Sequence, residues 1–184
     1  MRLWVFATSL VTAGFLTLTM TSPTAADTVV VLVRHAEKMS GMSDPPLSEA
    51  GEARAVALAK ALKGMRIDHI ISTGYKRTLS TAAPVARAFG LEPAILGVDS
   101  GFMSHIQSVA EAVRARPDGE TILVVGHSNT IPAIVGELGG PDLPELVEAN
   151  EYATMFVMMI SSKGKPRVLR TRYGAPDGSR TRAR

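Results

Sequence analysis

An arginine and a histidine follow directly on the first apolar run of this chain. The run extends from Val29 to Val33, and the pair is Arg34 and His35. Consecutive β-branched and aliphatic residues are typical of a parallel strand covered on both faces, so we expect the pair where that strand leaves the sheet. Ligands bind at this carboxyl edge of open α/β sheets. An imidazole is a competent nucleophile near neutral pH, and a guanidinium can hold an oxyanion by two parallel hydrogen bonds.

Two later segments repeat this arrangement of an apolar strand followed by polar residues. The first, residues 70–82, contains Arg77, and the second, residues 122–130, contains His127. Taken singly, Arg77 fits a solvated residue at a helix start, and His127 fits a hydrogen-bonded histidine at a strand end. Together with the Arg-His pair they favour a site with two imidazoles and two guanidiniums, which supplies the nucleophile and the positive charge that phosphoryl transfer needs.

In these three motifs the chain resembles the histidine phosphatase superfamily, also called the phosphoglycerate mutase-like superfamily. Members carry an Arg-His pair after the first strand, a second Arg early in the following helix and a Gly-His after a later strand. The resemblance covers about residues 28–172. The sequences His-Ala-Glu-Lys and Gly-His-Ser-Asn-Thr are most similar to the small, single-domain bacterial members.

The resemblance implies a role for five side chains. His35 would be the nucleophile, forming a phosphohistidine that water then hydrolyses. Arg34 and Arg77 would grip the phosphate oxygens. His127, in its protonated form, would stabilise the charge on those oxygens, and Asn129 would hydrogen-bond near it.

The general acid has no clear motif match. In the acid phosphatase branch an Asp follows the second His, but here that position is Ser128. In the mutase-like branch a Glu lies in the segment after the second Arg, and the nearest acid in a comparable context is Asp99. Asp99 is therefore our first candidate, with Glu37 and Glu111 behind it.

These motifs predict a metal-independent phosphomonoesterase without a cofactor. Cysteine is absent, and the four histidines show no metal-binding spacing.

Two alternatives within the family stay open, a phosphohistidine protein phosphatase and a non-catalytic phosphate-binding or adaptor domain. An α/β-hydrolase is disfavoured, because the near-match Gly126 to Thr130 ends in Thr where the nucleophile elbow needs a small residue, and because it leaves both arginines unexplained.

Alternating strand-like and helix-like runs predict a three-layer α/β/α sandwich with a mostly parallel sheet. The last two strands, separated by a Ser-Ser-Lys-Gly turn, are expected as a hairpin on the sheet edge. In the first helix, alanines at helical spacing are expected to form a close-packing face; they are Ala50, Ala53, Ala57 and Ala61. The expected strands are 29–33, 69–72, 94–96, 121–125, 154–160 and 167–171, and the expected helices are 49–63, 76–89, one around 106–113, and 130–138.

The two ends of the chain differ from the body. Residues 1–26 are expected to be a secretory signal peptide cleaved after Ala26, residues 27–173 the catalytic domain and residues 174–184 a disordered basic tail. Residues 161–184 hold eight Lys or Arg and one acid, whereas residues 27–160 hold eleven bases and sixteen acids.

Export predicts a periplasmic or secreted protein. After cleavage we expect no membrane span and no specific nucleic-acid partner, and the sequence leaves the oligomeric state open. Because export separates the protein from cytosolic glycolytic intermediates and phosphorelay proteins, we expect envelope-linked or sugar phosphates as substrates.

Overall fold

The computed structural model describes residues 26–99, 101–161 and 163–178. The signal peptide predicted at 1–26, apart from Ala26, lies outside the described residues, and so does the last part of the predicted tail. No described helix is long and apolar enough to cross a membrane.

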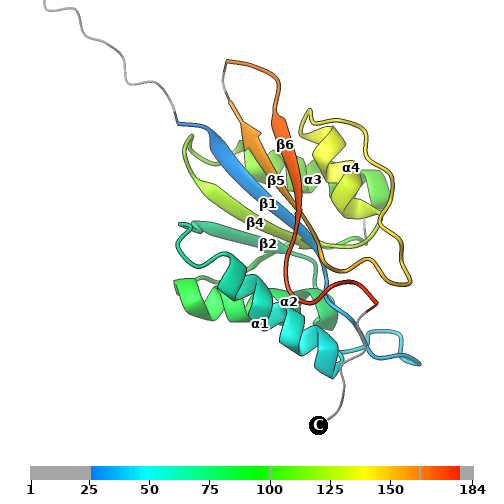
Figure 1. The fold of residues 1–184 in the computed structure, drawn as a ribbon. Helices are drawn as coiled ribbons and strands as arrows, with labels where there is room; N and C mark the ends of the chain where they lie inside the picture. Colours follow the sequence, from blue (N-terminus) through cyan, green and yellow to red (C-terminus); the bar gives the residue numbers. More distant parts are fainter. Residues whose placement is uncertain (1–25, 100, 162, 179–184) are drawn as a thin grey trace, which may run out of the picture.

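A six-stranded sheet forms the centre of the molecule (Figure 1), with the strand order β3-β2-β4-β1-β5-β6. The first four strands in this order are parallel, and β5 and β6 form an antiparallel hairpin at one edge. The predicted mostly parallel sheet with an edge hairpin is therefore confirmed. The strands are β1 (Thr28–Arg34), β2 (His69–Ser72), β3 (Ala94–Ile95), β4 (Thr121–Gly126), β5 (Thr154–Ile160) and β6 (Arg167–Arg172).

Two helices cover each face of this sheet, which confirms the predicted three layers (Figure 1). α1 (Glu49–Ala61) and α2 (Lys76–Phe89) lie on one face, and α3 (Phe102–Arg114) and α4 (Thr130–Glu137) lie on the other. Because successive strand side chains point to opposite faces, Val30 packs towards α3 and α4, and Val31 packs towards α1 and α2. Both side chains are fully buried.

Strand register places the functional loops side by side. Arg34, the last residue of β1, pairs with Gly126, the last residue of β4, and Ser72, the last residue of β2, pairs with Val125. The backbone N–H of His35 then donates to the Gly126 carbonyl over 2.9 Å. The three segments that carry the sequence motifs therefore leave the sheet at the same edge.

The inner face of α1 differs from the predicted alanine face. Ala53 and Ala61 are exposed, whereas Arg54 and Leu58 are buried. The buried guanidinium of Arg54 is satisfied by the Glu37 carboxylate, with Nη2 donating to Oε1 over 2.7 Å, and by two backbone carbonyls. This long-range pairing decides which face of the helix turns inwards.

The ordered chain continues past the predicted domain end at residue 173. Arg54 donates to the carbonyls of Tyr173 and Ala175 over 3.1 and 3.0 Å. Asp177 accepts hydrogen bonds from the backbone N–H groups of Tyr152 and Ala153, each over 2.8 Å. Residues 174–178 thus pack against α1 and against the segment that precedes β5.

Candidate active site

The structure brings His35, Arg77 and His127 together at the carboxyl edge of the sheet. His35 follows β1, Arg77 lies in the first turn of α2 and His127 follows β4. The ring centroids of His35 and His127 are 5.5 Å apart. Thr81 joins two of these segments, because its hydroxyl accepts from the Ala36 N–H over 2.9 Å and donates to the Arg77 carbonyl over 2.7 Å.

The ring of His35 is held in one tautomer. Its Nδ1 lies 2.7 Å from the Ala36 carbonyl oxygen, and because a carbonyl only accepts, Nδ1 carries the proton. The unprotonated Nε2 is therefore the nitrogen that is left with a free lone pair. Burial lowers the pKa of His35 to about 3, and the positive charges of Arg34 and Arg77 act in the same direction. The ring is neutral at pH 7, as a nucleophile must be.

His127 lies on a tightly packed turn after β4. A Cβ added at Gly126 would lie 2.8 Å from Thr130 Oγ1, so only glycine leaves room for Thr130 to accept from the His127 backbone N–H over 2.9 Å. Burial lowers the pKa of the His127 imidazole to about 4, with the Arg77 charge as the next cause. With this pKa the His127 ring is neutral at pH 7, so the role that the resemblance implied needs a proton to be added to it.

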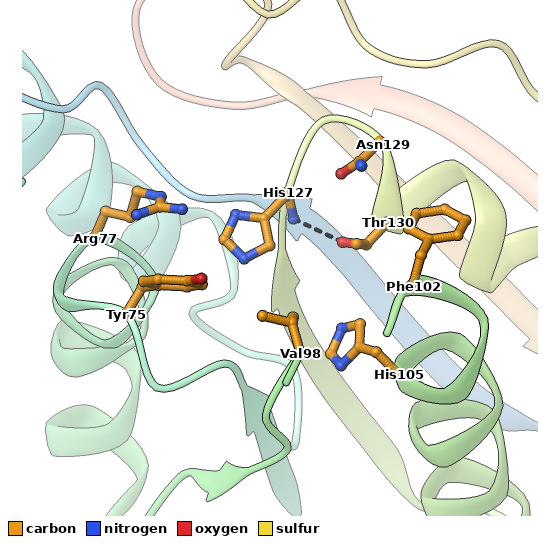
Figure 2. Close-up of a pocket in the computed structure, with 8 residues that line it drawn as sticks. All are labelled: Tyr75, Arg77, Val98, Phe102, His105, His127, Asn129 and Thr130. Carbon is orange, nitrogen blue, oxygen red and sulfur yellow. Dashed lines mark hydrogen bonds between the residues drawn. The ribbon is translucent and has the colours of Figure 1, made fainter. Parts of the chain in front are cut away.

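Two threonine hydroxyls determine where the neutral His127 carries its proton. The Thr78 hydroxyl lies 2.8 Å from the Tyr75 carbonyl, to which it donates. Thr73 then donates to Thr78 over 2.8 Å and must accept from Nε2 of His127 over 3.2 Å. Nδ1 is left unprotonated, and Figure 2 shows one ring nitrogen of His127 turned towards the guanidinium of Arg77.

Arg77 is a partly satisfied cation in this site. Its guanidinium lies 4.2 Å from the centroid of the Tyr75 ring, and its Nη1 is 3.7 Å from Oδ1 of Asp44. Its Nε is buried without a hydrogen-bond partner. Arg77 therefore has N–H groups that could donate to an anion.

Arg34 is placed differently from the phosphate fork that the sequence implied. Its side chain is fully buried, and its two terminal nitrogens donate to the carbonyls of Val147, Glu148 and Glu151 over 2.9 to 3.2 Å. The fourth terminal N–H faces the Glu148 carboxylate, 2.8 Å from Nη2. Only Nε, which is buried without a partner, remains available. In this state Arg34 anchors the segment 147–151 rather than presenting an open fork.

Sequence reasoning missed one residue of that segment, Glu148, and the residue that follows the segment, Tyr152. Glu148 accepts from the Ser128 hydroxyl over 2.6 Å as well as from Arg34. The Tyr152 ring lies 4.0 Å from the Arg34 guanidinium carbon and 6.2 Å from the His35 ring. The segment between α4 and β5 has no hydrophobic periodicity, so no pattern placed it over the site. The sequence signal in this segment was its acidic residues, which could have been predicted to form ion pairs with Arg34.

A cavity of about 380 Å³ lies over these residues. We call it the phosphate cavity. Asn129 lines it, and the Asn129 side chain makes no cap hydrogen bond to α4. The residues that line it are His35, Lys38, Arg77, His127, Ser128, Asn129, Glu145 and Glu148.

The three candidate acids lie in different places. Asp99 lines a neighbouring cavity together with Tyr75 and Asp44, and not the phosphate cavity itself. Glu37 is bound to Arg54 in a bidentate ion pair, which leaves its carboxylate occupied. Glu111 is exposed on α3 and lines none of these cavities. Of the three, Asp99 lines a cavity beside Tyr75, whose ring contacts the guanidinium of Arg77. Among the described residues, no group of three or more His, Asp or Glu is placed to hold a metal ion.

Comparison with protein families identifies one match. Residues 30–97, which include most of β1 and all of α1, β2, α2 and β3, match the model of the histidine phosphatase superfamily (branch 1). This part of the chain carries Arg34, His35 and Arg77.

Curated relatives match over longer segments. The chain is 33% identical to a probable phosphoglycerate mutase GpmB of Cronobacter sakazakii, over 49% of this chain and 52% of that protein. The match thus spans about half the length of that relative. The chain is 28% identical to phosphoserine phosphatase 1 of Hydrogenobacter thermophilus, over 62% of this chain and 77% of that protein.

A solved structure shows the same fold over almost its whole length. It is the putative phosphohistidine phosphatase SixA from Agrobacterium tumefaciens, with a TM-score of 0.60 and 24% sequence identity. The likeness covers 84% of this chain and 99% of that one. It extends the shared architecture beyond the segment that the family model matches.

Proposed function

Because the chain belongs to the histidine phosphatase superfamily, we propose that it is a phosphomonoesterase that works through a phosphohistidine on His35. One observation carries the proposal. The His35 imidazole is buried and neutral, its Nδ1 is bound to the Ala36 carbonyl, and its other nitrogen carries a free lone pair beside Arg77 and His127. A nucleophile with a fixed tautomer next to unpaired cationic donors is what covalent phosphoryl transfer requires.

The first step transfers the phosphoryl group to the enzyme. Nε2 of His35 forms a bond to phosphorus while the bond from phosphorus to the ester oxygen breaks. Arg77 and Nε of Arg34 donate to the equatorial oxygens, and His127 joins them once a proton has been added to its Nδ1. Asp99 in its acid form donates a proton to the departing alcohol oxygen.

The second step returns the enzyme to its starting state. Asp99, now a carboxylate, accepts a proton from water, whose oxygen attacks phosphorus. The bond from phosphorus to Nε2 of His35 breaks, and inorganic phosphate leaves. The positive charge in these steps comes from guanidinium and imidazolium groups, so we propose that no metal takes part.

The substrates that we propose are envelope-linked or sugar phosphates outside the cytoplasm. This part of the proposal rests on the signal peptide predicted at residues 1–26. The phosphate cavity lies among surface loops at the sheet edge, with the Glu148 side chain 62% exposed, and such a site can admit a phosphate carried by a larger molecule.

The test is phosphate release by the purified protein in the presence of EDTA, from a panel of phosphomonoesters and from phosphohistidine. We expect His35→Asn to abolish release. The matched control is His69→Asn, because His69 pairs with Glu120 at the start of β2, away from the cavity. A His35→Asn variant that keeps more than about a hundredth of the wild-type rate would contradict the proposal. A preference for phosphohistidine would change the proposed substrate class but would keep His35 as the proposed nucleophile.

A further inference from the structure

A second cavity opens beside the phosphate cavity. It has a volume of about 260 Å³ and shares Arg77, His127 and Asn129 with the phosphate cavity (Figure 2). We call it the alcohol cavity, because an ester whose phosphate contacts Arg77 and His127 can extend into it. What lines it therefore decides which alcohols the site accepts.

The walls of the alcohol cavity are mainly aromatic and apolar. Figure 2 shows Tyr75 on one side, and Val98, Phe102 and His105 on the other. Burial lowers the pKa of His105, so that its ring is uncharged at pH 7, and its Nδ1 donates to the Gly97 carbonyl over 3.0 Å. Phe102 is 44% exposed, so part of its ring is open to contact with a ligand.

The charges around the alcohol cavity disfavour an anionic alcohol. Among its described lining residues Arg77 is the only cation, and the phosphate itself engages that residue. The adjoining cavity, which shares Tyr75 and Val98 with it, adds the carboxyl groups of Asp44 and Asp99. A substrate carboxylate placed here would meet the negative charge of Asp44, and it would find no free cation. Lys38 lines the phosphate cavity but neither of these two.

Exposed apolar side chains continue the apolar surface outwards. Ile95, which lines the adjoining cavity, is 57% exposed, and Met103, next to Phe102 at the start of α3, is also 57% exposed. Large apolar side chains gathered around a pocket are typical of a place where an apolar ligand binds.

We propose that the alcohol cavity selects phosphomonoesters of uncharged alcohols with an apolar part, and disfavours esters that carry a carboxylate, such as phosphoserine or phosphoglycerate. The inference rests on the proposed function, since it assigns the substrate class of the same site. It narrows the envelope-linked and sugar phosphates to those whose alcohol can lie against Tyr75, Val98 and Phe102.

Binding of non-hydrolysable phosphonates tests this inference without requiring turnover. Calorimetry on the purified protein would compare ethylphosphonate, hexylphosphonate and 3-phosphonopropionate. We expect hexylphosphonate to bind about tenfold more tightly than ethylphosphonate, since part of the area of four added methylene groups leaves water. The carboxylate-bearing 3-phosphonopropionate should bind no more tightly than ethylphosphonate.

A pair of variants locates the effect. Phe102→Ala should bring the affinity for hexylphosphonate to within about threefold of that for ethylphosphonate. The matched control is Val56→Ala, which removes a comparably exposed apolar side chain (45%) from α1 and should leave the tenfold preference in place.

Equal affinity for the two alkylphosphonates, or tighter binding of 3-phosphonopropionate, would overturn the inference. Alkylphosphonate selectivity without hydrolysis of any ester would instead overturn the proposed function and keep the binding preference.

Discussion

Binding of an anion should bring a proton to His127. In the ligand-free protein burial lowers the pKa of this imidazole to about 4, so at pH 7 the ring is neutral. Its Nε2 proton is donated to Thr73, which leaves Nδ1 with no proton to give to a phosphate oxygen. A dianion in the phosphate cavity favours the charged ring and therefore raises this pKa.

The size of the effect follows from Coulomb's law. Two unit charges about 4 Å apart interact by about 4 kcal/mol at an effective dielectric constant of about 20, and about 1.4 kcal/mol corresponds to one pKa unit. A dianion at that distance then raises the pKa of His127 by about six units, and even half of that brings it close to 7. At pH 7 we expect between about half a proton and one proton to be taken up per bound anion.

Tungstate is a suitable ligand, because it stays a dianion from pH 6 to 8. Calorimetry in two buffers with different ionisation enthalpies gives the number of protons taken up. At pH values below the raised pKa of His127, the dissociation constant for tungstate should increase about tenfold for each unit by which the pH rises. Nitrogen NMR of the labelled imidazoles identifies the protonated ring, and His69→Gln is the control for a histidine outside the site.

We expect the proton on His127 and not on His35, because the pKa of His35 starts lower, at about 3, and a charged His127 disfavours a second charge beside it. Binding without proton uptake, or uptake located on His35, would refute this reasoning.

Three further outcomes follow from the same geometry. Between pH 7 and pH 5 the free energy of unfolding should fall by about 2 kcal/mol for each of His35 and His127, because both have a pKa far below the usual value of 6.5 when folded and bind a proton only when unfolded; urea titration measures this loss. Arg34→Met should lower the free energy of unfolding by about 3 kcal/mol in the same assay, because it removes three hydrogen bonds of a fully buried side chain at about 1 kcal/mol each. A smaller loss for Arg34→Met than for Arg77→Met would contradict this reasoning. Asp99→Asn should slow alkyl phosphates far more than aryl phosphates in steady-state kinetics, because an aryl oxygen leaves without a proton, and equal losses would remove Asp99 as the acid.

Much of the fold could be predicted from local patterns. The run from Val29 to Val33 has the composition of a buried parallel strand, and the structure places it in the centre of the sheet. Because parallel strands end at one edge, the residues after β1 and β4 had to meet there. Their convergence follows from the element order alone.

The environment of the site could not be predicted in the same way. The burial of Arg54 in place of the alanine face depends on Glu37 and on the segment after β6, both distant in sequence. The anchoring of Arg34 by segment 147–151 spans more than a hundred residues, with a separation of 113 positions between Arg34 and Val147. The neutral state of His127 depends on burial, which no spacing of residues reveals.

Trapping the phosphorylated residue is the most direct test of the role of His35. The protein would be mixed with a labelled phosphomonoester, quenched in alkali within a single turnover and digested for mass spectrometry. We expect a transient, alkali-stable and acid-labile phosphate on the peptide that contains His35, and its loss in His35→Asn. Label that passes from substrate to inorganic phosphate without appearing on the protein, or that appears on Ser128, would contradict a phosphohistidine on His35.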